Sequence, residues 1–278
     1  MPDDLVVAVL GTGTMGAAMA ANIVKAGLGL RIWNREPRMM EPLAELGAVV
    51  CASPAEASRG ADVILTPLAN ESVVAEVMDQ ARDGLDDAAL WLGVGYVEAP
   101  LLGTKEPAVA GTLTILAATA QTEARDRVRP ILDAVGSRTV WLDGVGQPSS
   151  LKLAYNAWVL TSVEGVAESL TLAKALGVDP KLVAEVIHGS ALDSGYVQAK
   201  APKMINGDLD TPSFPLVAAA KDAVLITDAA RAAGLRLGIA ETVRERLQLA
   251  VESGFGRADV AATYRVSRRV EQGNADDA

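Results

Sequence analysis

The sequence predicts two domains, an α/β domain with a doubly wound parallel sheet over residues 1–146 and an all-helical domain over residues 147–278. In the first part, short apolar runs rich in β-branched residues alternate with helical stretches, as in parallel strands joined by crossover helices. Strand-like runs stop at Pro148, and apolar residues then recur with a helical period. Half of the 278 residues are hydrophobic, enough for a sizeable core.

The first domain begins with an apolar run, residues 5–10, that suits a strand buried on both faces of a parallel sheet. A helix is expected over residues 15–26, because no helix breaker interrupts this stretch before Gly27. The other expected strands, which are also short and apolar, are residues 30–33, 49–51, 63–66, 89–92, 113–116 and 139–142.

The second domain begins with a long helix. Ser149 or Ser150 can cap its start, and Gly177 ends it. The pair Asp179-Pro180 favours a fresh helix start. The further expected helices are residues 181–188, 216–233, 240–253 and 257–270, and the polar tail after residue 271 is expected to fray.

Composition excludes several classes of function. A formal net charge of −10 argues against nucleic acid or an anionic membrane as a partner, since both select for basic patches. No apolar run reaches the roughly 18 residues that a membrane helix needs, and no secretory leader is recognisable. Cys51 is the single cysteine, which fits a reducing compartment, so we expect a cytoplasmic protein. The single histidine, His188, can build neither a zinc site nor a Ser-His-Asp triad, and no metal is expected.

A glycine-rich turn joins the first predicted strand to the first predicted helix. It reads Gly11-Thr12-Gly13-Thr14-Met15-Gly16. In a Gly-x-Gly-x-x-Gly turn, the first glycine allows a tight bend, the second lets the backbone approach a pyrophosphate, and the third lets the helix pack closely on the strand. The N–H groups of the helix start then bind the anion. This context predicts a Rossmann domain that binds a dinucleotide.

The end of the second predicted strand bears on which dinucleotide is bound. It reads Trp33-Asn34-Arg35-Glu36. NAD enzymes usually place a carboxylate here for the ribose 2′-hydroxyl, whereas Asn followed by Arg accepts a 2′-phosphate. NADP is therefore favoured, while NAD stays open because Glu36 can neutralise Arg35 or bind a hydroxyl itself. Leu68, just beyond the strand expected at residues 63–66, is a further candidate cofactor contact.

Four stretches in order resemble the β-hydroxyacid dehydrogenases, the family of 3-hydroxyisobutyrate dehydrogenase and of glyoxylate or succinic semialdehyde reductase, with a second domain similar to that of 6-phosphogluconate dehydrogenase. They are residues 10–22 with the glycine turn, residues 98–113 as the substrate loop, residues 146–156 as the catalytic motif and the pair Lys221-Asp222. The resemblance covers nearly the whole chain. It implies an NADP(H)-dependent oxidoreductase that interconverts a small β-hydroxy acid and its semialdehyde or keto acid by hydride transfer.

The resemblance also implies roles for particular side chains. Hydride transfer to a carbonyl leaves an alkoxide that must be protonated, and Lys152 is the candidate general acid. Asn156 follows one helical turn later on the same face and can hydrogen-bond the lysine or the substrate oxygen. Lys221 is expected at the nicotinamide end of the cofactor.

The candidate contacts of a substrate carboxylate lie in the second motif. They are the backbone of Gly103, the hydroxyl of Thr104 and the charge of Lys105. Leu102 stands where the family commonly has serine, which removes one side-chain donor. A small carboxylate-bearing substrate is the expected partner of the site.

One departure from the family lies between Leu92 and Val97, where only four residues stand in place of a longer loop and helix. Neighbouring parallel strands need a crossover of about a dozen residues. Residues 90–100 are therefore one extended segment, or an antiparallel hairpin, or a stretch from which residues are absent.

Two other functions stay open. An imine reductase shares the two-domain plan, although Lys152 argues against it. A non-catalytic dinucleotide-binding dimer would follow if the shortened segment abolished turnover. A homodimer is expected in every case, because the helical half has long apolar faces to bury.

Overall fold

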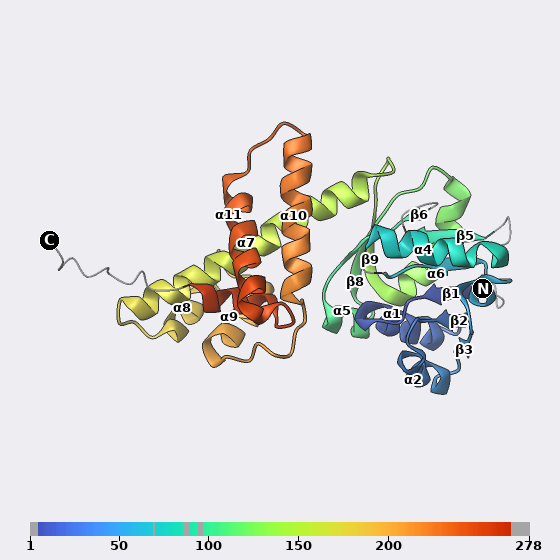
Figure 1. The fold of residues 1–278 in the computed structure, drawn as a ribbon, viewed down its shortest axis with the longest axis horizontal. Helices are drawn as coiled ribbons and strands as arrows, with labels where there is room; N and C mark the ends of the chain where they lie inside the picture. Colours follow the sequence, from blue (N-terminus) through green and yellow to red (C-terminus); the bar gives the residue numbers. More distant parts are fainter. Residues whose placement is uncertain (1–4, 69, 86–88, 94–96, 268–278) are drawn as a thin grey trace. The chain divides into compact units, whose positions relative to one another are not determined.

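The computed structural model describes residues 5–68, 70–85, 89–93 and 97–267. The chain divides into two compact units, Met1–Lys152 and Leu153–Ala278 (Figure 1). The expected fraying of the tail after residue 271 lies outside the described residues.

The first unit alternates strands and helices. Its strands are β1 (Val6–Leu10), β2 (Gly29–Trp33), β3 (Val49–Val50), β4 (Val63–Leu65), β5 (Leu90–Gly93), β6 (Val97–Glu98), β7 (Leu101–Leu102), β8 (Leu113–Ala117) and β9 (Gly136–Trp141). Its helices are α1 (Thr14–Lys25), α2 (Glu41–Glu45), α3 (Pro54–Ser58), α4 (Glu71–Ala81), α5 (Lys105–Ala110) and α6 (Thr122–Val135), with 3₁₀ turns η1 (Pro37–Met39) and η2 (Arg82–Gly84).

The main sheet has the strand order β3-β2-β1-β4-β5-β6, and all of its pairs are parallel. A second ladder, β7-β8-β9, pairs β7 with β8 in antiparallel and β8 with β9 in parallel. The order reverses next to β1, and in such sheets ligands bind at the carboxyl ends of the strands beside that switch point. The doubly wound parallel sheet is confirmed, and the antiparallel strand β7 belongs to the second ladder.

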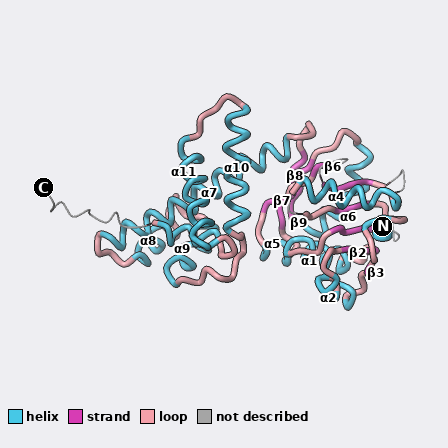
Figure 2. The backbone as a smooth tube through the Cα atoms, in the orientation of Figure 1, coloured by secondary structure: helices cyan, strands magenta, loops and turns pink. Residues whose placement is uncertain are grey.

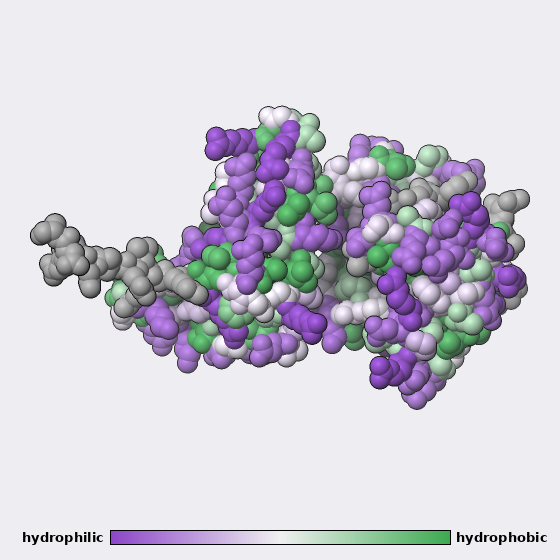
Figure 3. Space-filling model, viewed as in Figure 1, coloured by the Kyte–Doolittle hydropathy of each residue, from purple (hydrophilic) through white to green (hydrophobic). Residues whose placement is uncertain are grey.

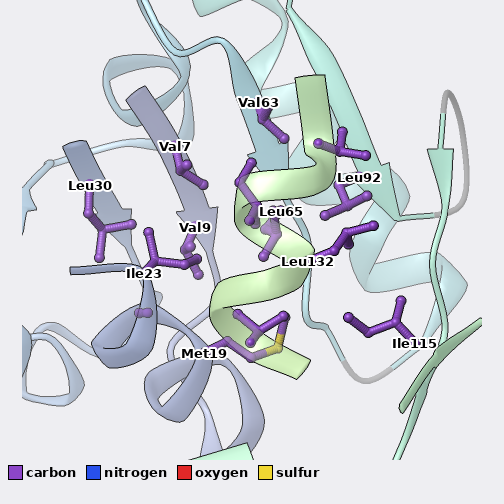
Figure 4. Packing of buried hydrophobic residues seen from close by; sticks show 14 of the residues in the cluster. Val7, Val9, Met19, Ile23, Leu30, Val63, Leu65, Leu92, Ile115 and Leu132 are labelled. Carbon is purple, nitrogen blue, oxygen red and sulfur yellow. The ribbon is translucent and has the colours of Figure 1, made fainter. Parts of the chain in front are cut away.

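Side chains of β1 alternate between two cores, because successive residues of a strand face opposite sides of the sheet. Val7 and Val9 belong to a cluster with α1 and α6, whereas Ala8 and Leu10 belong to a cluster with α3 and α4. Figure 4 shows the first cluster, where Val9 lies between the sheet and the helices. Burying each valine or leucine contributes about 1.5–3 kcal/mol, so this packing fixes the position of β1 and the turn that follows it.

The pairing of β6 corrects the expectation for residues 90–100. β6 is neither a continuation of β5 nor its antiparallel partner, because Leu92 pairs with Val97 and Gly93 with Glu98 in parallel. The crossover argument was wrong here because the two strands overlap by only these two pairs. Val97 therefore lies only about one residue rise, ~3.3 Å, behind Gly93 along the strand direction. Residues 94–96 themselves lie outside the described residues.

The second unit is helical, and Figure 2 shows the strands confined to the first unit. Its helices are α7 (Gln147–Ala175, which starts in the first unit), α8 (Pro180–Ile187), α9 (Gly195–Asn206), α10 (Leu216–Ala232) and α11 (Gly238–Ala250), followed by a π-helical turn, η3 (Val251–Phe255), and a 3₁₀ segment, η4 (Val260–Val266). The expectation of an α-helix over residues 257–270 was wrong. Among the described residues of this range, only the tighter 3₁₀ segment η4 forms. α9 was not expected. Among the described residues, none of these helices combines the length and apolar content needed to cross a bilayer.

A buried ion pair lies inside the helical unit. The Lys200 Nζ atom donates to both carboxylate oxygens of Asp259, at 2.7 and 2.9 Å, and the two side chains are 2 % and 0 % exposed. Burial alone would raise the pKa of Asp259, but the hydrogen bonds and charge of Lys200, with backbone N–H groups of Ala261 and Ser213, hold it below its usual value. The pair therefore joins α9 to the start of η4.

Candidate active site

The glycine turn lies at the carboxyl end of β1, and close packing sets its shape. Gly11 has a φ of +118°, and a β-carbon on Gly16 would lie 2.1 Å from the Gly11 carbonyl oxygen. Only glycine at position 16 lets α1 start this close to the turn. Leu68 lies against the same turn, with its Cδ2 atom 2.6 Å from where a β-carbon of Gly11 would be.

The start of α1 fits a pyrophosphate. Its N-cap is Gly13, which provides no side-chain hydrogen bond, and a β-carbon there would meet no atom within 4 Å. The first N–H groups of a helix have no partner within the helix. Thr14 and Met15 therefore present backbone donors, beside an open surface, with the positive end of the helix dipole behind them.

Asn34 and Arg35 leave the carboxyl end of β2 beside this turn. The Asn34 Oδ1 atom accepts from the Thr12 N–H at 3.1 Å, and its Nδ2 atom donates to the Glu36 carbonyl at 3.2 Å. Arg35 forms an exposed ion pair with Glu76 of α4 at 3.5 Å rather than with Glu36. Asn34 thus supports the glycine turn, while the guanidinium of Arg35 remains at the surface.

A hollow of about 510 Å³ opens at the carboxyl ends of β2 and β3. Its lining residues are Trp33, Asn34, Arg35, Pro37, Met40, Val50, Cys51 and Ala52. The apolar walls suit a flat aromatic ring, and Arg35 suits an anion at the rim. Burial raises the pKa of the Cys51 thiol, which keeps this wall uncharged.

The predicted substrate loop connects β7 to α5. Gly103 lies in tight surroundings, since a β-carbon there would be 2.7 Å from Leu113 Cδ2. The Thr104 hydroxyl donates to Glu106 at 2.9 Å, and Lys105 is exposed. The sequence analysis did not name Glu106 as a site residue. Its carboxylate accepts the hydrogen bond that the Thr104 hydroxyl was expected to donate to a substrate carboxylate.

Glu98 is a second residue that sequence reasoning missed. It ends β6, is 4 % exposed, and its carboxylate accepts hydrogen bonds from Gly146 N at 2.5 Å, Ser149 N at 2.9 Å and Ser149 Oγ at 2.5 Å. Glu98 therefore caps the first turn of α7, which carries half-buried Lys152 one turn after Ser149. The only sequence signal was an acidic residue at the start of the substrate-loop motif.

A cluster in the helical unit joins two of the predicted residues. Asp222 accepts from Asn156 Nδ2 at 3.0 Å and pairs with Lys221 at 3.0 Å. Asn156 lies on α7, one turn after Lys152, and Lys221 lies on α10. The structure thus links Asn156 to Lys221 through Asp222. The sequence analysis had not predicted this connection.

Comparison with known proteins covers both units. The model of the NAD binding domain of 6-phosphogluconate dehydrogenase matches in two stretches, residues 6–91 and 85–144, which overlap at residues 85–91. The model described as NAD-binding of NADP-dependent 3-hydroxyisobutyrate dehydrogenase matches residues 146–267. Both descriptions name nicotinamide dinucleotides as the cofactor.

Individual relatives match over nearly the full chain. Glyoxylate/succinic semialdehyde reductase 2 of Arabidopsis thaliana is 27 % identical over 96 % of this chain and 80 % of its own. 3-Sulfolactaldehyde reductase of Escherichia coli is 29 % identical over 92 % of this chain and 93 % of its own. The crystal structure of a 3-hydroxyisobutyrate dehydrogenase from Salmonella typhimurium has a TM-score of 0.85 at 24 % identity, covering 95 % of this chain and all of that one.

The family models match both the unit that carries the glycine turn and the helical second unit, and the fold matches that of the solved structure. The chain is an NAD(P)-dependent oxidoreductase whose first unit is a Rossmann domain. It belongs to the β-hydroxyacid dehydrogenase family.

Proposed function

We propose that the protein reduces a small aldehyde or keto acid bearing a carboxylate, such as a semialdehyde or glyoxylate, with NADPH, or catalyses the reverse oxidation. One observation carries the proposal. Glu98 ties the segment leading to Gly103 and Thr104 directly to the first turn of α7, one turn before Lys152. The candidate carboxylate-binding loop and the candidate general acid thus lie on segments that are bonded to each other.

When bound, NADPH would supply the hydride that reaches the carbonyl carbon. Lys152, as an ammonium, gives a proton to the oxygen that becomes the alcohol, and in the reverse direction the neutral amine takes it back. Asn156 assists from one turn further along α7. Because its Nδ2 atom donates to Asp222, its amide oxygen is left to accept from the lysine or from the substrate hydroxyl.

The substrate carboxylate binds at the start of α5. The Thr104 hydroxyl already donates its hydrogen bond to Glu106. The donors that remain for the substrate are the backbone N–H groups of Gly103 and Thr104 and the exposed ammonium of Lys105. The negative charge of Glu106 disfavours a second acidic group beside the loop. Small monocarboxylates are therefore the substrates that these residues suit best.

The residues lining the hollow beside β2 would hold the adenosine end of the cofactor, and Arg35 would bind its 2′-phosphate. The pair of Arg35 with Glu76 is exposed on both sides, and such pairs contribute only about 0–1 kcal/mol, so a phosphate can replace Glu76. Asn34 is occupied by Thr12 and Glu36 and offers no carboxylate to a 2′-hydroxyl. These contacts support NADP over NAD.

The test is NADPH and NADH oxidation with glyoxylate, succinic semialdehyde and a cyclic imine, using wild type and Lys152→Ala. We expect turnover of an aldehyde with NADPH, a loss of about 10²–10⁴-fold in Lys152→Ala, and partial rescue by added methylamine. Turnover of the imine alone would indicate an imine reductase. Cofactor binding without turnover of any compound would indicate a non-catalytic protein.

We also propose a homodimer formed through the helical unit, working in the cytoplasm. Several large apolar side chains of this unit are more than two-thirds exposed, namely Trp158, Leu176, Val186, Leu192 and Ile239. Figure 3 shows apolar surface gathered on the face of this unit in view. Large exposed apolar patches mark protein interfaces. Light scattering at several concentrations tests the proposal, and a monomer at all of them would refute it.

A further inference from the structure

The buried carboxylate of Glu98, which joins the substrate-loop segment to α7, has so far been given no role of its own in the reaction. Glu98 is anchored by its backbone, since its N–H donates to the Ala118 carbonyl at 2.9 Å and its carbonyl accepts from the Ala118 N–H at 3.0 Å. Its side chain then reaches the residues that begin α7. The backbone of Glu98 is therefore fixed to the neighbouring ladder, and its side chain extends from there to α7.

Both carboxylate oxygens of Glu98 are used at the helix start. One accepts from Gly146 N, and the other accepts from both Ser149 N and Ser149 Oγ. A charged acceptor at a helix N-terminus satisfies N–H groups that have no partner in the helix and interacts favourably with the helix dipole. Hydrogen bonds to charged groups contribute about 1.5–3 kcal/mol each, more than neutral ones. The first turn of α7 is thus held by three hydrogen bonds to one buried carboxylate.

We infer that Glu98 is a positioning residue for Lys152, an assignment that rests on the proposed function of Lys152 as the general acid. Lys152 stands one turn beyond Ser149, so the direction of its side chain follows the orientation of that turn. Glu98 also begins the segment that leads to Gly103. A single carboxylate therefore sets the spacing between the proton donor and the loop that holds the substrate.

The test compares Glu98→Gln and Ser149→Ala with matched controls. Glu98→Gln keeps the side-chain shape but places an NH₂ group against a backbone N–H of Gly146 or Ser149. Ser149→Ala removes one donor only. Ser150→Ala is the control for a lost hydroxyl, because Ser150 Oγ donates to the Gly146 carbonyl and not to Glu98. Glu164→Gln is the control for a lost buried carboxylate, since Glu164 is 5 % exposed and accepts from Arg246 and Thr263 in the helical unit.

The measurements are kcat on an accepted aldehyde, the Kd for NADPH by fluorescence and the melting temperature. A misplacement of about 1 Å can lower a rate by about 100-fold. We expect Glu98→Gln to lower kcat by about 10- to 100-fold with an unchanged Kd for NADPH, because the glycine turn is untouched. Ser149→Ala should lower kcat less, and Ser150→Ala should not. Glu164→Gln should lower the melting temperature without lowering kcat of the folded protein.

Two results would overturn the inference. If kcat falls no further in Glu98→Gln than in Glu164→Gln, Glu98 is only structural. If Glu98→Gln does not fold, equal kcat values for Ser149→Ala and Ser150→Ala overturn it instead. The Lys152→Ala variant distinguishes a failure of the positioning role of Glu98 from a failure of the proposed function. An active Lys152→Ala refutes both, whereas an inactive Lys152→Ala beside a fully active Glu98→Gln refutes the positioning role alone.

Discussion

Substitution of the second and third glycines of the cofactor turn, Gly13 and Gly16, should separate protein stability from cofactor binding. In Gly16→Ala, the new β-carbon would lie 2.1 Å from the Gly11 carbonyl oxygen. Ordinary contacts are more than 1 Å longer, so the start of α1 must move by about that distance. Overpacking of this kind costs about 1–3 kcal/mol, which lowers the melting temperature by about 2–12 °C for a unit of this size. The N–H groups that face the pyrophosphate move with the helix, so NADPH binding should weaken as well.

Gly13→Ala is the matched comparison. A β-carbon at this position would meet no protein atom within 4 Å, and the φ of Gly13 is −68°, which alanine adopts freely. The melting temperature should therefore stay unchanged, whereas NADPH affinity should fall because the methyl group stands where the pyrophosphate approaches. Thermal unfolding and quenching of tryptophan fluorescence by NADPH measure the two effects. A Gly16→Ala protein with unchanged stability and affinity would refute the packing argument, and a Gly13→Ala protein with unchanged affinity would refute the placement of the pyrophosphate.

Three further predictions concern other contacts. Arg35→Ala should weaken NADPH binding by at least about tenfold and leave NADH binding unchanged, because a charged hydrogen bond contributes about 1.5–3 kcal/mol; equal losses for both cofactors would contradict this role. Asn22→Ala should cost about 1–3 kcal/mol in urea unfolding, since Asn22 Nδ2 donates to the buried Ala108 carbonyl at 2.8 Å, and an unchanged midpoint would count against it. Lys200→Met should cost about 3–5 kcal/mol by leaving Asp259 buried and unpaired. Since the folded pKa of Asp259 is lowered, its contribution is present above the unfolded value near 4 and is lost as the pH falls through the folded value; acid titrations of stability with the same slope in wild type and Asp259→Asn would contradict this.

The sequence was sufficient for elements whose signal is local. β1, β2, β4 and β5 are apolar runs between turn residues, and the glycine turn lies between a strand and a helix, so their places follow from pattern alone. β6 and β7 have two residues each, too few for any periodicity. α9 contains Pro202, which reads as a helix breaker, although tertiary packing keeps the helix intact around it.

The contacts of the candidate site depend on residues far apart in the chain. Glu98 caps a helix about 50 positions away, and Asp222 meets Asn156 across a separation of 66. Neither contact follows from spacing or composition. The glycine turn was predictable because its chemistry is contained in six consecutive residues. The Lys152→Ala assay above tests the role of Lys152, and the roles of Lys221 and of the substrate loop stay predictions.

The bond between Asn34 and the Thr12 amide has a practical consequence for changing coenzyme preference. The residue that would be exchanged to favour NAD also supports the glycine turn that we propose as the pyrophosphate site. Asp at position 34 retains an acceptor for Thr12, whereas a larger or apolar replacement would disturb the binding of both coenzymes. In the proposed binding mode, engineering that starts at Arg35 alters the contact with the 2′ position and leaves the bond between Asn34 and Thr12 intact.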